Sequence, residues 1–148
     1  MKEPIYNWDN ENKIATCTIR DEEGHIFQGK AVCHPEDMEF ASEYVGYDIA
    51  TERAIIDYLK YLKRDVLMPG LKALNQLYYS INKSKEFSYK HYETRMLMRQ
   101  IRMKENDIDL ITEALAIRSD NLARYIESKG ETYKKIREMR KSKQCQQD

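Results

Sequence analysis

The sequence predicts an α+β fold, in which a small N-terminal antiparallel β-sheet is followed by long α-helices. Residues 13–33 contain two alternating runs, KIATCTIR and HIFQGKAVC, joined by DEEG, and this pattern is typical of a β-hairpin. Beyond Gly46, apolar residues recur at spacings of three and four, which indicates amphipathic helices. Residues 89–129 contain no proline or glycine, so we expect a helix of roughly 40 residues there.

The predicted hairpin has two different faces. Residues alternate along its first strand, with Ala15, Cys17 and Ile19 on one face and Ile14, Thr16, Thr18 and Arg20 on the other. Gly24 supplies the positive φ of the turn, and Gly29 in the return strand indicates a bulge or a close backbone approach. Because two strands alone are marginally stable, a third strand from residues 3–8, a partner chain or the long helix must cover them.

The first long helix is expected from Tyr47 to about Leu67, after a helical turn or loop over residues 38–45. Pro69 lacks an N–H group and disfavours helical geometry at the residue before it, so we expect a kink or break there. A second helix follows, and residues 82–88, NKSKEFS, form a linker.

The long helix has a coiled-coil-like pattern with flaws. Apolar residues recur every seven positions at Ile101, Ile108, Leu115 and Leu122. A helix about 60 Å long cannot pack entirely on so small a domain, so we expect a partner, most simply a second copy of the chain. Gly130 can end this helix, residues 131–143 are again helical in pattern, and residues 142–148 are expected to be frayed.

Length and composition limit the organisation of the chain. With 148 residues, we expect an α+β domain over residues 1–82 and a helical extension over residues 83–148 that packs on it or on another subunit. No apolar run is long enough to span a membrane, and MKEPIYNW does not resemble a secretory signal. Three cysteines without a CxxC spacing argue against disulfides and a zinc site, so we expect a cytoplasmic protein without a membrane partner.

Charge is distributed unevenly along a chain whose formal net charge is zero. Residues 1–50 carry a net charge of −7 and residues 51–148 a net charge of +7. Such opposition favours association of the acidic front of one copy with the basic tail of another, or of the tail with a polyanion. Solvated helix faces explain the same pattern without any partner.

The sequence contains no recognisable catalytic motif. Cys33 and His34 are adjacent, and adjacent strand residues point to opposite faces. The sequence has no P-loop and no GxGxxG run, and the three histidines match no metal-ligand spacing. We therefore expect a protein that is not an enzyme, with neither a cofactor nor a metal.

Several residues are suited to binding a nucleotide. Arg20 ends the first strand and Arg53 lies in the first long helix, where arginines can hold phosphate; for Arg53 the alternative is an ion pair with Asp57. Trp8 can stack on a base or close a pocket, or simply cover the open end of the sheet. Tyr78 and Tyr79 offer further stacking surfaces, although such a pair is more often core plus surface.

A second candidate site lies on the long helix. Arg95, Arg99 and Arg102 share one helix face, which indicates a stripe for nucleic acid. The next turn is acidic, with Glu105, Asp107 and Asp109, and this argues against a polyanion partner.

The pattern GKAVCHPED…G…IA..RA, which covers residues 29–54 after the hairpin, resembles small proteins encoded by phages and prophages. Among them the chain is most similar, over about residues 5–85, to the phage anti-Thoeris sponge proteins. This resemblance implies an N-terminal antiparallel sheet with long C-terminal helices, assembled as dimers and higher oligomers in the cytoplasm of the host cell. It also implies sequestration, without cleavage, of cyclic ADP-ribose isomers or cyclic oligonucleotides.

The resemblance further implies roles for single residues. Arg20 and Arg53 match arginines that contact phosphates, Trp8 matches an aromatic residue that stacks on adenine, and Tyr78 or Tyr79 matches a further stacking residue. The leading hypothesis is therefore a counter-defence protein that sequesters a cyclic nucleotide signal. The alternative is an oligomeric protein- or nucleic-acid-binding module that inhibits a host nuclease or defence complex.

Overall fold

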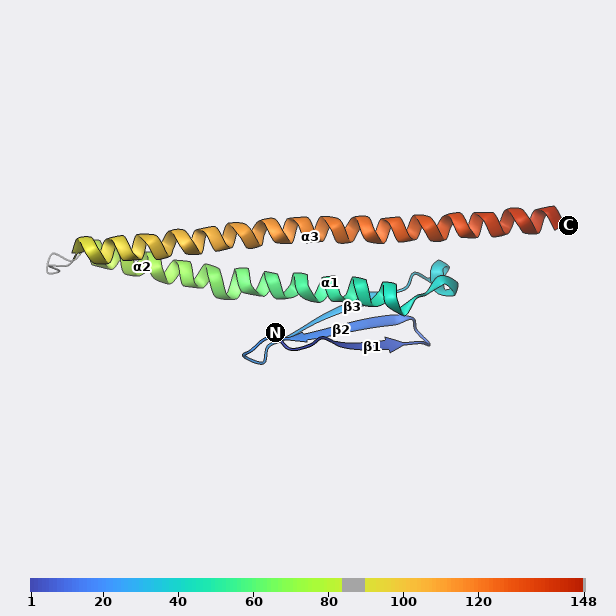
Figure 1. The fold of residues 1–148 in the computed structure, drawn as a ribbon, viewed down its shortest axis with the longest axis horizontal. Helices are drawn as coiled ribbons and strands as arrows, with labels where there is room; N and C mark the ends of the chain where they lie inside the picture. The colour runs from blue at the N-terminus through green and yellow to red at the C-terminus, as the bar shows by residue number, and fades with distance from the viewer. Residues whose placement is uncertain (84–89, 148) are drawn as a thin grey trace. The chain divides into compact units, whose positions relative to one another are not determined.

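The computed structural model describes residues 1–83 and 90–147, and it confirms the α+β fold class (Figure 1). The elements follow in the order β1 (Ile5–Asp9), β2 (Ile14–Arg20), β3 (Ile26–Val32), η1 (Pro35–Phe40), α1 (Glu43–Tyr61), η2 (Leu62–Leu67), α2 (Met68–Lys83) and α3 (Lys90–Gln147). Most of the expected linker over residues 82–88 lies outside the described residues. None of the helices in the described part of the chain is both long enough and apolar enough to cross a membrane.

The chain divides into two compact units. One comprises residues 1–57 and 117–148, and we call it the sheet unit; the other comprises residues 58–116, and we call it the helical unit. The expected boundary at residue 82 falls inside the helical unit.

The sheet unit is built on a three-stranded antiparallel sheet in the order β1-β2-β3. Its third strand, β1, comes from the N-terminal residues, as one of the alternatives predicted. The register of β2 and β3 is unbroken from the pair Ile14 and Val32 to the pair Arg20 and Ile26, so the sheet has no bulge at Gly29. The turn after β2 contains Gly24 with a φ of +92°, as predicted.

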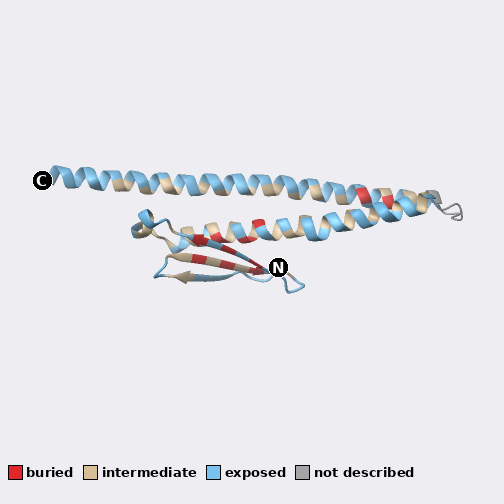
Figure 2. Ribbon diagram, turned by 180° about the vertical axis from the view of Figure 1, so that it is seen from behind, coloured by how far each residue is buried: buried red, intermediate tan, exposed pale blue. Residues whose placement is uncertain are grey.

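One face of this sheet is buried under α1. Ala15, Cys17 and Ile19 are buried, which confirms the predicted apolar face. At Gly29 the helix backbone comes so close that a methyl group would lie 1.8 Å from the oxygen of Ala50. Gly29 therefore marks a close backbone approach, the second of the two alternatives. Figure 2 shows buried residues on the strands and on the neighbouring part of α1.

The first helix begins one turn earlier than predicted, at Glu43 rather than Tyr47. The Ser42 hydroxyl accepts a hydrogen bond from the N–H of Val45 at 3.5 Å and so caps the first turn. The short segment before it forms the 3-10 helix η1.

Of the kink or break expected at Pro69, the break is wrong, because the helical backbone continues through the proline into α2. The irregularity lies just before the proline, where η2 is a π-helical segment. Its last hydrogen bond runs from the N–H of Met68 to the oxygen of Lys63, five residues back. This wider turn comes just before Pro69, which has no N–H to donate.

The helix end expected at Gly130 is also wrong, and residues 142–147 are helical where a frayed tail was expected over residues 142–148, since α3 runs from Lys90 to Gln147. Glycine in a helix costs about 1 kcal/mol relative to alanine. That cost is offset by side-chain contacts on the next two turns, where Tyr133 stacks on Phe40 and Arg137 forms an ion pair with Asp37.

In the helical unit, α2 lies beside the first part of α3 (Figure 1). Leu97 and Ile101 are buried, Ile108 borders a shallow hollow with residues of α2, and Ile111 borders another with Leu62 and Leu67. The seven-residue seam of α3 therefore faces helices of the same chain in this unit. A homo-oligomer stays a prediction.

Candidate ligand pocket at Trp8

The sheet unit contains a cavity of about 190 Å³ at the end of the sheet where Trp8 lies. Its walls come from the β1–β2 turn, the end of β3, η1, the start of α1 and the C-terminal part of α3. The residues that line it are Trp8, Lys13, Ala31, Val32, Cys33, His34, Asp37, Ala41, Ser42, Val45, Gly46, Ile49, Ile126, Lys129, Gly130 and Tyr133.

The turn between β1 and β2 brings Trp8 and Lys13 to this cavity. The Asp9 carboxylate accepts hydrogen bonds from the N–H of Glu11 at 3.0 Å, the N–H of Asn12 at 3.1 Å and the Asn12 side chain at 2.8 Å. These bonds, above all those from Asn12, hold the pKa of Asp9 below its usual value. Lys13 takes a left-handed φ of +52°, and the chain then enters β2 directly.

Gly46 allows the first turn of α1 to form the next wall. A methyl group on this residue would lie 2.7 Å from the side chain of Ala15 and 3.3 Å from the ring of Trp8. Only a residue without a side chain lets the helix approach the sheet this closely. Gly46 thereby holds one edge of the indole ring against α1, and Trp8 is half-buried.

The wall opposite is formed by the segment that leaves β3. His34 caps η1, since its Nδ1 accepts a hydrogen bond from the N–H of Glu36 at 3.2 Å, and Pro35 occupies the first turn of η1. The thiol of Cys33 donates to the oxygen of His34 at 3.6 Å. Because Nδ1 of His34 accepts a backbone N–H, this side chain stabilises the start of η1.

Side chains of α3 hold η1 in place from the other side. The Tyr133 ring stacks on Phe40 with the centroids 5.4 Å apart, and Arg137 forms an ion pair with Asp37. Arg140 forms an ion pair with Glu39 at 2.9 Å and lies over the Phe40 ring. Acidic residues of η1 thus form ion pairs with basic residues near the C-terminus of the same chain. The uneven charge of the sequence did not distinguish such pairing from pairing between two copies.

Two further contacts tie α3 to α1 within the sheet unit. Arg118 donates to both carboxylate oxygens of Glu52 at 3.0 Å. The Tyr125 hydroxyl donates to Asp48 at 3.1 Å. Burial and this hydrogen bond raise the pKa of Tyr125 to about 12.

The cavity combines aromatic surface, two lysines, neutral polar groups and the carboxylate of Asp37, whose charge is paired with Arg137. Burial, followed by the charge of Asp37, raises the pKa of Cys33, and burial also raises the pKa of Tyr133. Cys33 is therefore a thiol at neutral pH, which is a weak nucleophile. Lys13 and Lys129 supply positive charge, and the Trp8 ring supplies a stacking surface. These groups suit binding of a planar, anionic molecule by stacking and charge.

One cluster elsewhere in the sheet unit has metal-ligand chemistry. Donor atoms of Asp21, Glu23 and His25 lie within 4.8 Å of one another in the turn after β2. Asp21 accepts from the N–H of His25 at 2.8 Å and contacts its ring at the same distance. These hydrogen bonds shape the turn around Gly24 and explain the cluster without an ion.

The structure places Trp8 in the cavity and Arg20 away from it. In β-pairing, directly opposed residues have side chains on the same face of the sheet. Trp8 is opposed to Ala15, which is on the face under α1. Side chains two or four residues apart in a strand point to the same face, so Arg20 shares the face of Thr16 and Thr18, opposite to the face under α1. Within one chain, Trp8 and Arg20 cannot line a single pocket.

Arg53 does not line the Trp8 cavity, and it forms no ion pair with Asp57 among the described residues. Its guanidinium donates to the backbone oxygen of Lys30 at 2.6 Å. In an antiparallel ladder, opposed residues that exchange backbone hydrogen bonds alternate with opposed residues that do not. The N–H of Cys33 donates to the oxygen of Lys13, so this pair is hydrogen-bonded. By alternation, the pair of Lys30 and Thr16, three positions along, is not hydrogen-bonded. The Lys30 oxygen thus faces the open edge of β3, where Arg53 satisfies it and blocks pairing with another strand.

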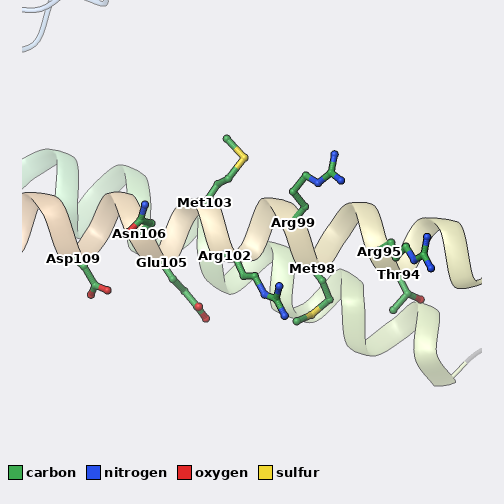
Figure 3. Close-up of a pocket in the computed structure, with 9 residues that line it drawn as sticks. All are labelled: Thr94, Arg95, Met98, Arg99, Arg102, Met103, Glu105, Asn106 and Asp109. Atoms are coloured by element: carbon green, nitrogen blue, oxygen red, sulfur yellow. The ribbon is translucent and has the colours of Figure 1, made fainter.

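The remaining predicted residues lie in the helical unit. Tyr78 is half-buried in α2, and Tyr79 is exposed with the Lys83 ammonium 4.6 Å from its ring centroid. Arg95, Arg99 and Arg102 border a hollow of about 940 Å³ whose lining residues all belong to α3. Figure 3 shows Arg99 and Met103 extending to one side of the helix and Arg102, Glu105 and Asp109 to the other. The hollow is therefore an open surface of mixed charge.

Sequence reasoning missed Lys13, Lys129 and Tyr133 as pocket residues. Tyr133 lies in residues 131–143, which were predicted only to be helical, and Lys129 carried no local signal. Both reach the cavity because α3 returns along α1, a contact between segments far apart in the chain. The asparagine-rich turn before Lys13 was the one local sign of a shaped loop in the sequence.

Comparison with protein families, with curated proteins and with solved structures finds no match to this chain. The resemblance to phage sponge proteins therefore stays a prediction.

Proposed function

We propose that the protein is a non-catalytic binding protein that sequesters a small nucleotide, of the cyclic nucleotide class, at the Trp8 pocket. One observation supports this function best: a single cavity is lined by the Trp8 indole, the Tyr133 ring and two lysines, Lys13 and Lys129. An aromatic face accepts a nucleobase, and ammonium groups attract the phosphates that the base carries.

The size of the cavity limits how a nucleotide would fit. Pockets that enclose drug-sized molecules measure about 300–1,000 Å³, whereas this cavity measures about 190 Å³. One ring system would enter it, and the sugar and phosphates would remain at its rim. The proposal thereby assigns phosphate attraction to Lys13 and Lys129, in place of the roles predicted for Arg20 and Arg53.

Trp8 is the only tryptophan in the chain, so its fluorescence reports on this pocket alone. The test is a titration with cyclic ADP-ribose isomers and cyclic dinucleotides, followed by Trp8 fluorescence and by calorimetry. Afterwards the ligand is recovered and checked by chromatography. We expect one nucleotide to quench Trp8 and to be recovered intact. The absence of any quenching and heat across the panel would contradict the proposal, and recovery of a cleaved ligand would show an enzyme.

Variants locate the site in the same assay. Lys129→Glu should weaken binding by about tenfold or more, because it places a carboxylate where phosphate is attracted. Lys134→Glu, an exposed lysine on the same helix outside the cavity, is the matched control. Arg20→Ala should leave binding unchanged. If Arg20→Ala abolishes binding and Lys129→Glu does not, the ligand binds the other face of the sheet.

The hollow on α3 supports a second candidate function, an oligomeric protein- or nucleic-acid-binding module that inhibits a host nuclease or defence complex. Its three arginines form no ion pair within the described residues. Nucleic-acid binding would fall steeply with salt, so a flat salt profile of binding to a DNA or RNA oligonucleotide would contradict that form of the function. Glu105 and Asp109 on the same surface favour a protein partner of mixed charge.

A further inference from the structure

The 3-10 helix η1 and the residues that flank it form one wall of the Trp8 cavity. Four residues of this segment line the cavity: His34, Asp37, Ala41 and Ser42. The same segment contacts the C-terminal part of α3, where the Tyr133 ring stacks on Phe40. The contacts that hold η1 therefore decide whether this wall of the cavity stays closed.

The backbone of η1 is not tied to the rest of the sheet unit. Its hydrogen bonds run from the N–H of Asp37 to the oxygen of His34 at 2.8 Å and from the N–H of Ala41 to the oxygen of Met38 at 3.3 Å, both within the segment. Among the described residues, no backbone hydrogen bond joins η1 to a strand or to α1, and no residue of η1 is buried. Segments with few buried contacts open locally at a small cost in free energy.

Ion pairs with α3 hold η1 instead. Arg137 pairs with Asp37 and lies 3.5 Å from Glu36, and Arg140 pairs with Glu39 at 2.9 Å. The side chains of Glu36, Glu39 and Arg140 are 70%, 54% and 58% exposed. Exposed ion pairs are individually weak and are screened by salt. We call these three ion pairs the arginine latch.

Both ends of η1 have a backbone suited to a hinge. His34, with a φ of −63° and a ψ of 140°, and Ala41, with a φ of −56° and a ψ of 122°, are extended residues on either side of the helix. Changes of φ and ψ at a few residues that end an element are enough for a hinge motion. The hydrogen bond from the N–H of Glu36 to His34 keeps the first turn formed, so η1 moves as one piece.

We propose that η1 is a lid on the Trp8 pocket and that the arginine latch keeps this lid closed until a ligand enters. At about 190 Å³ the closed cavity has room for one ring system and little besides, so movement of this wall eases the entry of a base. Movement of η1 also frees the face of Tyr133 that stacks on Phe40, which gives a second stacking surface in the pocket. The inference rests on the proposed function for its ligand, whereas the motion of the lid is measured without one.

The test labels the thiol of Cys33, which lines the cavity next to His34, with a small and a bulky alkylating reagent in separate reactions without nucleotide. Both reagents react with the same thiolate, so the ratio of the bulky to the small rate reports access to Cys33 and is independent of its pKa. Mass spectrometry of peptides separates Cys33 from the exposed Cys145 and the buried Cys17. The rates are measured in about 50 mM and about 500 mM salt.

Two variants open the latch from its two sides. One carries Arg137→Gln and Arg140→Gln, and the other carries Glu36→Gln and Glu39→Gln. None of these four residues lines the cavity. Lys134→Gln with Lys141→Gln is the control, because it removes two positive charges from exposed positions of α3 outside the cavity. Circular dichroism checks that each variant keeps its helices.

We expect the ratio for the wild type to be low in low salt and to rise in high salt. Each latch variant should raise the ratio by about threefold or more in low salt and respond less to added salt, because the screened pairs are already gone. The control should match the wild type. An unchanged ratio in both latch variants, or a control that changes as much as they do, would overturn the lid.

A nucleotide titration separates this inference from the proposed function. If the latch variants expose Cys33 while no nucleotide quenches Trp8, the lid is supported and the proposed ligand is wrong. Where a nucleotide binds, its association rate should rise in the latch variants together with the labelling ratio, since entry depends on the open fraction. An association rate that both latch variants leave unchanged would contradict entry through the lid.

Discussion

The sheet unit and the helical unit differ in how much apolar surface they bury. Among the described residues, the sheet unit buries Ala15, Cys17, Ile19, Phe27, Ala31, Ala50, Ala54 and Ile56, and the helical unit buries Leu97 and Ile101. Figure 2 shows the same contrast, with buried residues concentrated on the strands and on α1. In the helical unit large side chains such as Met103, Leu110 and Tyr79 are exposed.

This contrast teaches that the two units are completed in different ways. The sheet unit covers its apolar and acidic groups with its own elements. The apolar face of the sheet packs under α1, and arginines of α3 pair with Asp37, Glu39 and Glu52. The cavity at Trp8 lies within that closed arrangement. The helical unit has fewer buried side chains among its described residues and leaves large apolar side chains such as Met103 exposed.

The largest expected effect breaks the sheet unit at its closest approach. Gly29→Ala places a methyl group 1.8 Å from the oxygen of Ala50 and 2.6 Å from the nitrogen of Ala54. Since both neighbours are backbone atoms, α1 must move off the sheet, and the free energy of unfolding should fall by about 3 kcal/mol or more. Urea denaturation measures it. Gln28→Ala, an exposed position next to it, should change stability by less than about 0.5 kcal/mol.

A smaller loss is expected where α3 holds η1. In a double-mutant cycle of Asp37→Asn and Arg137→Gln, we expect a coupling energy of about 1–2 kcal/mol, because the two side chains are only 15% and 24% exposed. The exposed pair of Asp120 and Arg124 should give about 0.5 kcal/mol or less. Equal couplings at the two pairs would show that η1 is not held by this contact.

A gain in stability of similar or smaller size is expected at Gly130. A methyl group there meets nothing within 4 Å, and alanine is the better helix former. Gly130→Ala should therefore raise the free energy of unfolding by about 0.5–1 kcal/mol, measured by urea denaturation. A loss of stability would mean that α3 is not helical through this position.

The smallest effect is a pH dependence of the contact between Tyr125 and Asp48. The folded state holds the pKa of Tyr125 at about 12, above its value of about 10 in an unfolded chain. The stabilisation is thus present below pH 10 and is lost as the pH rises from about 10 to 12. Tyr125→Phe should lose stability less steeply than the wild type over this window in urea denaturation. Parallel curves for the two proteins would contradict the assigned contact.

Much of the fold was predictable because local patterns determine it. Alternation along β2 placed Ala15, Cys17 and Ile19 on one face, which the structure buries, and Gly29 indicated a bulge or a close backbone approach, of which the second is present. The predicted break at Pro69 and the predicted helix end at Gly130 were wrong for a common reason. Local propensity was outweighed by a π-helical turn in one case and by contacts with η1 in the other.

The candidate site was less predictable, because distant segments build it. Trp8 was predicted as a binding residue from its residue type. Arg20 does not line the same cavity, because side chains alternate along β2 and Arg20 lies on the other face of the sheet. Lys129 and Tyr133 come to the cavity only through the return of α3 along α1. No spacing within the sequence carries that information.

The most direct test of the proposed division of roles is hydrogen exchange of the full chain, with and without the cyclic nucleotide that binds best in the titration. Exchange should slow in residues 6–10, 31–46 and 126–133, which surround the Trp8 pocket, and stay unchanged in residues 58–83 and 90–116. Slower exchange confined to residues 92–113 would contradict the pocket in the sheet unit. It would place the ligand on the surface of α3 that carries Arg95, Arg99 and Arg102. Unchanged exchange throughout would contradict it equally.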